Sequence, residues 1–152
     1  MAQSLMQIYL HLIFHVKYSS VKIKEADIPL LHAYTAGTLK SIGSIPLQGG
    51  GINDHMHVLC TLPKALTIPD LVEKLKKSCN KHLKTHDANH YRDFHWQNGY
   101  AAFSVSGNVI FNVKGYISHQ KEHHAHRSFE EEYLSLMKEL GIEFNEKYVL
   151  CD

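Results

Sequence analysis

Two histidines separated by one apolar residue begin an apolar run in the middle of the chain. His55-Met56-His57 leads into Val58 and Leu59, and residues i and i+2 of a β-strand project from the same face. His55 and His57 would therefore stand side by side, with Met56 pointing into the core behind them. Imidazoles are common metal ligands. The pair predicts either a metal site or two hydrogen-bonded structural histidines.

A tyrosine and a carboxamide follow later in the chain, four residues apart. Tyr116 and Gln120 would share one helical face, beside an apolar stripe that includes Val113 and Ile117. The phenol is a candidate nucleophile and the amide oxygen a candidate ligand. A helical tyrosine on its own usually packs its ring and hydrogen-bonds its hydroxyl. The chemical interpretation of Tyr116 depends on its lying opposite the two histidines.

Three other kinds of site fit the sequence poorly. A histidine-triad nucleotide hydrolase would need a third histidine where Leu59 stands, and the H-E-x-x-H motif of zinc proteases is absent. A structural zinc site would need clustered cysteines, whereas Cys60, Cys79 and Cys151 are scattered.

Composition sets further bounds. The chain has 152 residues, of which 44% are hydrophobic and 20% charged, which is ordinary for one globular domain. Its formal net charge of +1 gives no overall attraction to nucleic acid, so only local patches could provide one. An odd number of cysteines without a C-x-x-C motif indicates reduced thiols. With no secretory signal and no apolar run of ~20 residues, we expect a soluble, cytoplasmic protein that has no contact with a membrane.

The predicted elements alternate between strands and helices. Residues Gln7–Lys17 alternate between two faces, which predicts a long strand. Start and stop signals then predict a helix from Asp27 to Gly43, a strand over 45–48, a strand over His55–Leu62, a helix from Thr67, a loop over 85–99, a strand over 100–106, a helix from Ser106, and a last helix from Ser128 to Gly141. This order predicts an α+β fold with a ferredoxin-like β-α-β-β-α-β core, in which an antiparallel sheet is covered by helices and further helices follow at the C-terminus.

Local signals support several of these boundaries. Asp27 and Ser106 are candidate N-caps, and Thr67 and Ser128 each begin a capping box. Gly49–Gly51 would allow a bend or bulge before the histidine strand.

Together these motifs resemble the single-domain HUH tyrosine transposases of small insertion sequences and of related repeat-associated elements. The name HUH denotes His-hydrophobic-His, here His55-Met56-His57, and the family's tyrosine and glutamine match Tyr116 and Gln120. Other segments that resemble this family are Trp96–Tyr100, Ala102–Ser106 and Gln120–His124. The resemblance extends from the first strand to the tail near Tyr148 and implies one HUH transposase catalytic domain over residues 1–152.

The resemblance implies a metal-dependent DNA reaction. A divalent ion (Mg²⁺ or Mn²⁺) would be held by His55, His57 and Gln120 and would polarise a scissile phosphate of single-stranded DNA at hairpin-marked ends. Tyr116 would attack phosphorus, giving a 5′-phosphotyrosine and a free 3′-hydroxyl. The covalent ester would allow rejoining without ATP, in keeping with the absence of a phosphate-binding P-loop motif.

The resemblance also implies a homodimer acting at the nucleoid of a prokaryote. In some members the tyrosine helix of one subunit completes the HUH site of the other. We expect Gln7–Lys17 to be an edge strand that could pair subunits.

A basic stripe is a candidate DNA-binding surface. Its members recur at helical spacing: Lys74, Lys77, Lys81 and Lys84. They would suit phosphate contacts to a hairpin, although such a stripe is also the ordinary solvated face of an amphipathic helix.

Four other histidines are open to two interpretations: His11, His15, His123 and His124. Each could support the metal site or be structural. Two other functions also remain open, a DNA-hairpin-binding module that is catalytically silent or domesticated, and a single-tyrosine nickase of replication, which generally carries extra domains.

Overall fold

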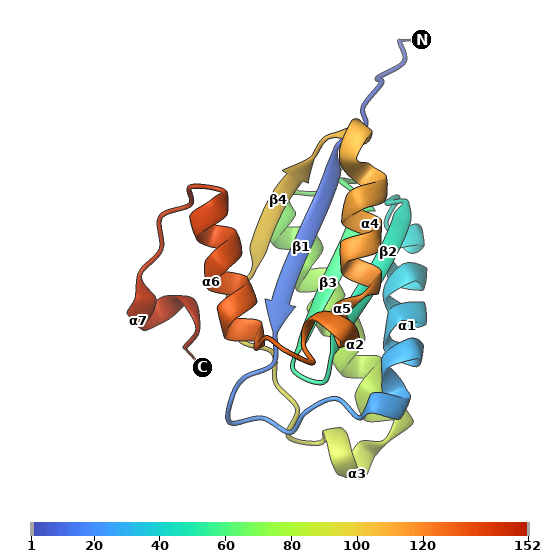
Figure 1. The fold of residues 1–152 in the computed structure, drawn as a ribbon. Coiled ribbons are helices and arrows are strands. Elements are labelled where there is room, and N and C mark those ends of the chain that lie inside the picture. Colours follow the sequence, from blue (N-terminus) through green and yellow to red (C-terminus); the bar gives the residue numbers. More distant parts are fainter. Residues whose placement is uncertain (1, 152) are drawn as a thin grey trace.

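A four-stranded antiparallel sheet forms the centre of the computed structural model, which describes residues 2–151. Its strands are β1 (Tyr9–His15), β2 (Pro46–Ile52), β3 (His55–Thr61) and β4 (Ala101–Val105). Their order is β2-β3-β1-β4, and every pairing is antiparallel (Figure 1). This is the ferredoxin-like arrangement, so the predicted α+β fold is confirmed.

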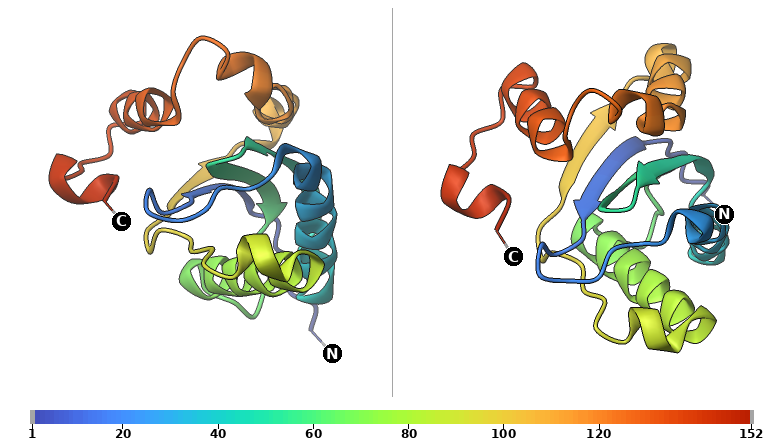
Figure 2. Two further views of the ribbon diagram at one scale, coloured as in Figure 1. Left: turned by 90° about the horizontal axis from the view of Figure 1, so that it is seen from below. Right: turned by 60° about the horizontal axis from the view of Figure 1, so that its bottom comes forward.

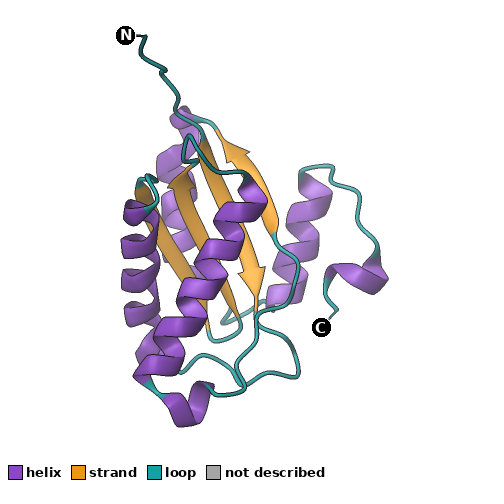
Figure 3. Ribbon diagram, turned by 180° about the vertical axis from the view of Figure 1, so that it is seen from behind, coloured by secondary structure: helices purple, strands orange, loops and turns teal. Residues whose placement is uncertain are grey.

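Two helices cover one face of the sheet. They are α1 (Ile28–Ser41) and α2 (Ile68–His86). In the rear view of Figure 3, α2 crosses in front of the sheet. The alternation along β1 sends Leu10, Leu12 and Phe14 into the main core beneath these helices, where they meet Met56 and Val58 from β3.

A second helical layer covers the opposite face. It consists of α4 (Ile110–Ser118), α5 (Gln120–His123) and α6 (Phe129–Glu139), with α7 (Glu146–Val149) beyond them. Figure 2 shows the sheet between this layer and the layer of α1 and α2. A smaller core lies here, formed by Ile13, Ala101, Phe129, Tyr133 and Met137. The histidine-bearing face of β1 and β3 is therefore enclosed by the C-terminal third of the chain.

Two of the four predicted N-caps are confirmed. The side chain of Thr67 accepts a hydrogen bond from the Asp70 amide, and that of Ser128 accepts one from the Glu131 amide. Ser106 makes no capping hydrogen bond, because the short 3₁₀ turn η2 (Gly107–Val109) precedes α4.

Asp27 does not cap α1 and instead forms part of a buried polar cluster. It ends the 3₁₀ turn η1 (Glu25–Asp27) and makes no capping hydrogen bond. Its Oδ2 accepts a hydrogen bond from the Tyr91 hydroxyl at 2.5 Å, and its Oδ1 lies 3.0 Å from His86 Nε2. Because these tertiary contacts occupy the Asp27 carboxylate, it does not cap α1.

The segment predicted as a loop over 85–99 is partly helical. Helix α2 extends to His86, and α3 (Ala88–Tyr91) follows, capped by Asp87 through the His90 amide. Phe94 and Trp96 then enter the main core, where the Trp96 ring meets Phe14 edge to face at 4.8 Å. The aromatic residues of this segment pack inward, which overrides its polar composition.

The glycine triplet does not bend the chain as expected, since β2 continues through it. The register irregularity lies earlier, between Pro46 and Gln48. Gly50 permits a close approach of α4: a Cβ atom there would lie 2.0 Å from the carbonyl oxygen of Ile117. The absence of a side chain lets α4 pack directly on β2.

The expectation that Gln7–Lys17 is an edge strand is wrong. β1 pairs with β3 on one side and β4 on the other, and its buried residues explain this position. The edges of the sheet are β2 and β4.

No helix in residues 2–151 has the length and apolar character that a bilayer crossing requires.

Candidate active site

His55 and His57 lie on the sheet face beneath the C-terminal helices. Both side chains are buried, and their ring centroids are 5.1 Å apart. Met56 points to the opposite face and joins the main core. The i, i+2 spacing thus places the two imidazoles as the alternation predicted.

Gln120 meets His55 at the start of α5. Its Oε1 lies 2.9 Å from His55 Nε2, and its side chain is buried. The helix predicted to run unbroken from Tyr116 to Gln120 is interrupted, because α4 ends at Ser118 and His119 adopts a non-helical conformation. The turn at His119 directs Gln120 toward the histidine pair.

Glu132 reaches the same point from α6 and is only 2% exposed. Its Oε1 lies 3.1 Å from His57 Nε2 and 3.7 Å from His55 Nε2. Its Oε2 accepts hydrogen bonds from Gln120 Nε2 at 3.2 Å and from the Tyr116 hydroxyl. Glu132 is not among the site residues predicted from the sequence.

A signal for Glu132 was present in the sequence. Phe129, Tyr133 and Met137 form the apolar stripe of α6, and position 132 falls on this stripe, three residues after Phe129. A carboxylate on the buried face of a helix is uncommon and indicates a bound partner.

Tyr116 stands beside the histidines of its own chain. Its ring centroid lies 5.9 Å from that of His57 and 4.9 Å from that of His123. Burial and the hydrogen bond to the Glu132 carboxylate raise the pKa of the Tyr116 hydroxyl. The phenol is therefore held in its protonated form.

Two outer contacts orient the imidazoles. Asp54 Oδ1 lies 2.7 Å from His55 Nδ1, and His11 Nε2 lies 2.8 Å from His57 Nδ1. Burial raises the pKa of the Asp54 carboxyl, but the hydrogen bond from His55 more than offsets this effect and holds that pKa below its ordinary value. An ionised Asp54 accepts the Nδ1 proton of His55, which leaves the Nε2 lone pair facing Gln120.

Burial favours the neutral form of two other imidazoles. It lowers the pKa of His57 to about 4 and that of His11 to about 3. Neutral imidazoles are the form that binds metal.

The donor set fits a divalent cation. The ligand atoms of His55, His57 and Glu132 lie within 4.8 Å of one another, and the Gln120 oxygen faces His55 at hydrogen-bond distance. Lone pairs that converge in a buried space need a proton or a cation between them. The mixed nitrogen and oxygen donors suit Mn²⁺ and related ions as well as Mg²⁺.

The remaining histidines divide between the site and its surroundings. His124 Nε2 lies 3.0 Å from Gln120 Oε1, so it borders the ligand cluster, and His123 packs on Tyr116. His15 bonds the carbonyl of Val16 and packs on Phe129, outside the cluster.

The lysine stripe lies on the other side of the sheet. Lys74, Lys77 and Lys81 are exposed on α2 and Lys84 is half-buried, in the layer that covers the opposite face (Figure 2). Lys77 pairs with Glu73 at 2.6 Å. The structure does not bring these lysines together with the histidines and Tyr116.

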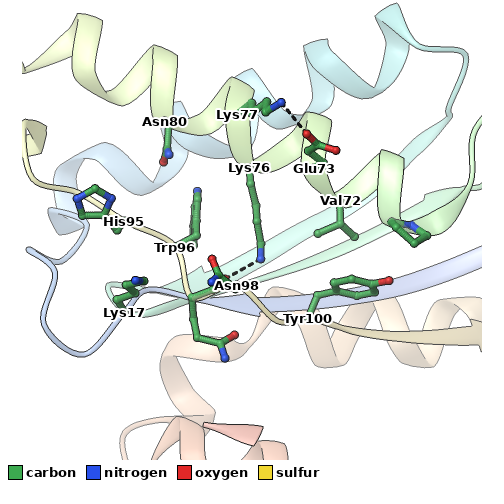
Figure 4. Close-up of a pocket in the computed structure, with 12 residues that line it drawn as sticks. Lys17, Val72, Glu73, Lys76, Lys77, Asn80, His95, Trp96, Asn98 and Tyr100 are labelled. Carbon is green, nitrogen blue, oxygen red and sulfur yellow. Dashed lines mark hydrogen bonds and ion pairs between the residues drawn. The ribbon is translucent and has the colours of Figure 1, made fainter. Parts of the chain in front are cut away.

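A cavity of about 380 Å³ borders the stripe, between α2 and the segment that precedes β4 (Figure 4). Lys76 reaches into it and donates hydrogen bonds to the carbonyls of Gln97 and Gly99. Burial lowers the pKa of Lys76 to about 8. The lysine bound to this loop is thus one that the stripe does not include.

A larger cavity of about 910 Å³ adjoins the candidate metal ligands on the side of α1 and β2. Gln120 and His124 lie on its wall, opposite the glycine triplet of β2.

Comparisons with known proteins agree with the fold described above. A structure of a chain assigned as a transposase from Deinococcus radiodurans has a TM-score of 0.61 and 19% identity, covering 79% of this chain and 95% of that one. A REP-associated tyrosine transposase bound to a REP hairpin has a TM-score of 0.57 and 12% identity, covering 82% and 73%. At these identities the likeness shows a shared fold. No curated protein matches the chain.

The family itself is identified by sequence. The family described as "Transposase IS200 like" matches residues 4–120, a segment that includes the histidine pair, Tyr116 and Gln120. This chain belongs to the IS200-like transposase family.

Proposed function

We propose that this chain cleaves and rejoins single-stranded DNA through a 5′-phosphotyrosine intermediate, in one catalytic domain over residues 1–152. Tyr116 is the nucleophile, and His55, His57 and Gln120 hold a divalent ion, Mg²⁺ or Mn²⁺. The observation that carries the proposal is the convergence of these four side chains, with His55, His57 and Gln120 buried and Tyr116 half-buried beside them, within a chain of a transposase family.

The proposed substrate is a DNA strand whose ends are marked by hairpins. The solved relative that is bound to a REP hairpin supports this choice. Such a substrate would place the protein at the nucleoid of a prokaryotic cytoplasm.

The residues divide the reaction between them. Tyr116 Oη attacks the phosphorus, the bond from phosphorus to the 3′-oxygen breaks, and the 3′-end leaves as a hydroxyl after it takes up a proton. His55, His57 and Gln120 would hold a divalent ion, whose positive charge would polarise the phosphate and favour the phenolate of Tyr116. Rejoining is the same step in reverse, with a 3′-hydroxyl as the attacking group.

Tyr116 needs activation. An ordinary tyrosine with a pKa of about 10 is ionised to only about one part in 10³ at pH 7, and the pKa of Tyr116 lies higher than that. We therefore expect no cleavage in the presence of a chelator.

Covalent trapping tests the proposed function. Hairpin DNA labelled at its 3′-end, incubated with the protein and Mn²⁺, should give a labelled adduct that survives denaturing electrophoresis, whereas a 5′-label should be released. Tyr116→Phe should abolish the adduct, and Tyr148→Phe, a change at an exposed tyrosine, should leave it intact.

The same assay separates the alternatives. An adduct that persists in Tyr116→Phe would overturn the assignment of the nucleophile. Hairpin binding without an adduct under any ion would favour a binding module, and adduct formation without strand joining would favour a nickase.

We also propose that Lys74, Lys77, Lys81 and Lys84 contact phosphates of the hairpin, since three of them are exposed along α2. Each Lys→Gln change should weaken binding regardless of sequence and reduce the slope of log Kd against log salt by about 1. Lys138→Gln, on exposed α6 surface, is the control. Slopes that match this control would identify the stripe as a solvated face.

The proposed assembly is a homodimer. With β1 inside the sheet, the strands able to pair between subunits are β2 and β4. The tyrosine and its cluster come from one chain, so this arrangement needs no exchange of helices. Light scattering should give twice the mass of one chain, and a monomer mass at working concentrations would contradict the dimer.

A further inference from the structure

The carboxylate of Glu132 faces the proposed metal ligands with one oxygen and the nucleophile with the other. Glu132 follows the segment 4–120 that the family match covers, and the ligand set proposed above does not include it. We propose that Glu132 is a fourth protein ligand of the ion through Oε1 and that its Oε2 holds the Tyr116 hydroxyl. This inference rests on the proposed metal site and adds a positioning role for α6.

The distances match one coordination shell. Neighbouring ligands of an octahedral ion with bonds of about 2.1 Å lie ~3 Å apart. Glu132 Oε1 lies 3.1 Å from His57 Nε2, and Gln120 Oε1 lies 2.9 Å from His55 Nε2. The Glu132 oxygen therefore stands where a ligand adjacent to His57 would stand.

The charge of Glu132 also indicates a cation. Within residues 2–151 the ion-pair partners of this buried carboxylate are His55, His57 and His124. None of these partners is a lysine or an arginine. A buried carboxylate requires a compensating charge, and a divalent ion at this position would provide it.

The second oxygen ties the nucleophile to the same point. Glu132 Oε2 accepts hydrogen bonds from Tyr116 and Gln120. One planar group thus fixes the separation between the attacking oxygen and the ion, which would otherwise depend on the broken junction between α4 and α5.

Another residue of the following segment has the geometry of a ligand. The Nδ1 of His124 lies 2.6 Å from the carbonyl oxygen of Arg127, which accepts its proton and turns the Nε2 lone pair toward Glu132 Oε1, 3.4 Å away. Three imidazole nitrogens therefore lie within 3.7 Å of the Glu132 oxygen, and an ion bound to that oxygen would lie close to them.

Metal titration without DNA tests the proposal. Wild type, Glu132→Gln and Glu131→Gln are titrated with Mn²⁺ and followed by electron paramagnetic resonance, and with Co²⁺ followed by its visible absorption. Glu132→Gln should raise the Kd for Mn²⁺ at least tenfold and change the Co²⁺ spectrum. Glu131→Gln, one residue earlier and exposed, should match wild type. Glu132→Gln within twofold of this control would overturn the proposal and leave a structural hydrogen bond.

Two further measurements distinguish loss of a metal ligand from loss of folding. The melting temperature of each metal-free variant shows whether Glu132→Gln is folded. If it is not, a crystal of the wild type with Mn²⁺ decides: a Glu132 oxygen within bonding distance supports the proposal, and a carboxylate turned away overturns it.

The outcome is distinguishable from that of the proposed function. Weak Mn²⁺ binding by Glu132→Gln, with an adduct that survives Tyr116→Phe, would support the ligand and refute the nucleophile. Normal binding by Glu132→Gln, with an adduct that Tyr116→Phe abolishes, would do the reverse. A wild type that binds no divalent ion would refute both.

Discussion

At the scale of residues, Asp54 determines which nitrogen of His55 carries the proton. Its carboxylate accepts the Nδ1 proton at 2.7 Å and so leaves Nε2 free as a ligand. We expect Asp54→Asn to weaken Mn²⁺ binding by about 10–100-fold, as loss of such an outer partner typically does. Titration of the variant measures this. Asp93→Asn, at an exposed carboxylate, is the control, and equal affinities for the two variants would contradict the orienting role.

Local sequence patterns found those site residues whose spacing lies within a single element. Strand alternation placed His55 and His57, and helical spacing brought Tyr116 and Gln120 close together although the helix is interrupted. Their chemical roles remain predictions. Glu132 escaped because it joins the cluster through tertiary packing of α6, and no pattern along the chain relates it to the histidines on β3.

At the scale of elements, Gly50 sets the distance between β2 and α4. A Cβ there would lie 2.0 Å from the Ile117 carbonyl oxygen, so Gly50→Ala should push α4 outward and displace Tyr116, the residue before Ile117. We expect a loss of about 1–3 kcal/mol in the free energy of unfolding, typical of overpacking, measured by urea denaturation, and a slower formation of the covalent adduct.

A second glycine provides the matched control. A Cβ at Gly37, inside α1, meets nothing within 4 Å, so Gly37→Ala should be neutral or stabilise the protein by about 0.5–1 kcal/mol through helix propensity. Equal losses for Gly37→Ala and Gly50→Ala would show that the contact with α4 carries no particular strain.

The elements were predictable where one local signal dominates. The capping residues Thr67 and Ser128 fixed the starts of α2 and α6. The predictions failed where tertiary contacts compete. Asp27 accepts a hydrogen bond from Tyr91 in place of one from a helix amide. After α2, buried aromatic side chains order a segment that was predicted to be a loop. β1 was placed at an edge because alternation describes which faces a strand presents, and says nothing about its neighbours.

At the scale of the whole molecule, the proposed ion would join β3, α5 and α6. β3 is distant in sequence from α5 and α6, so the site forms only in the folded chain. Ion binding should therefore stabilise the folded chain by about 2.7 kcal/mol at 100 times its Kd. For a chain of this length we expect the melting temperature to rise by roughly 5–10 °C. Calorimetry with Mn²⁺ and after addition of a chelator measures this shift. An unchanged melting temperature at saturating Mn²⁺ would argue against a site built from all three elements.

The three consecutive glycines of β2 have a consequence beyond helix packing. With α6 closing one flank of the ligand cluster, the large cavity beside β2 and α5 is the open flank, and Gly49 and Gly51 are among the residues that line it. A DNA backbone that approached from that side would meet no side chain at these two positions. A side chain at Gly51 would narrow this approach and also disturb the histidine strand, because φ is +141° there and a Cβ would lie 2.3 Å from the His55 carbonyl oxygen.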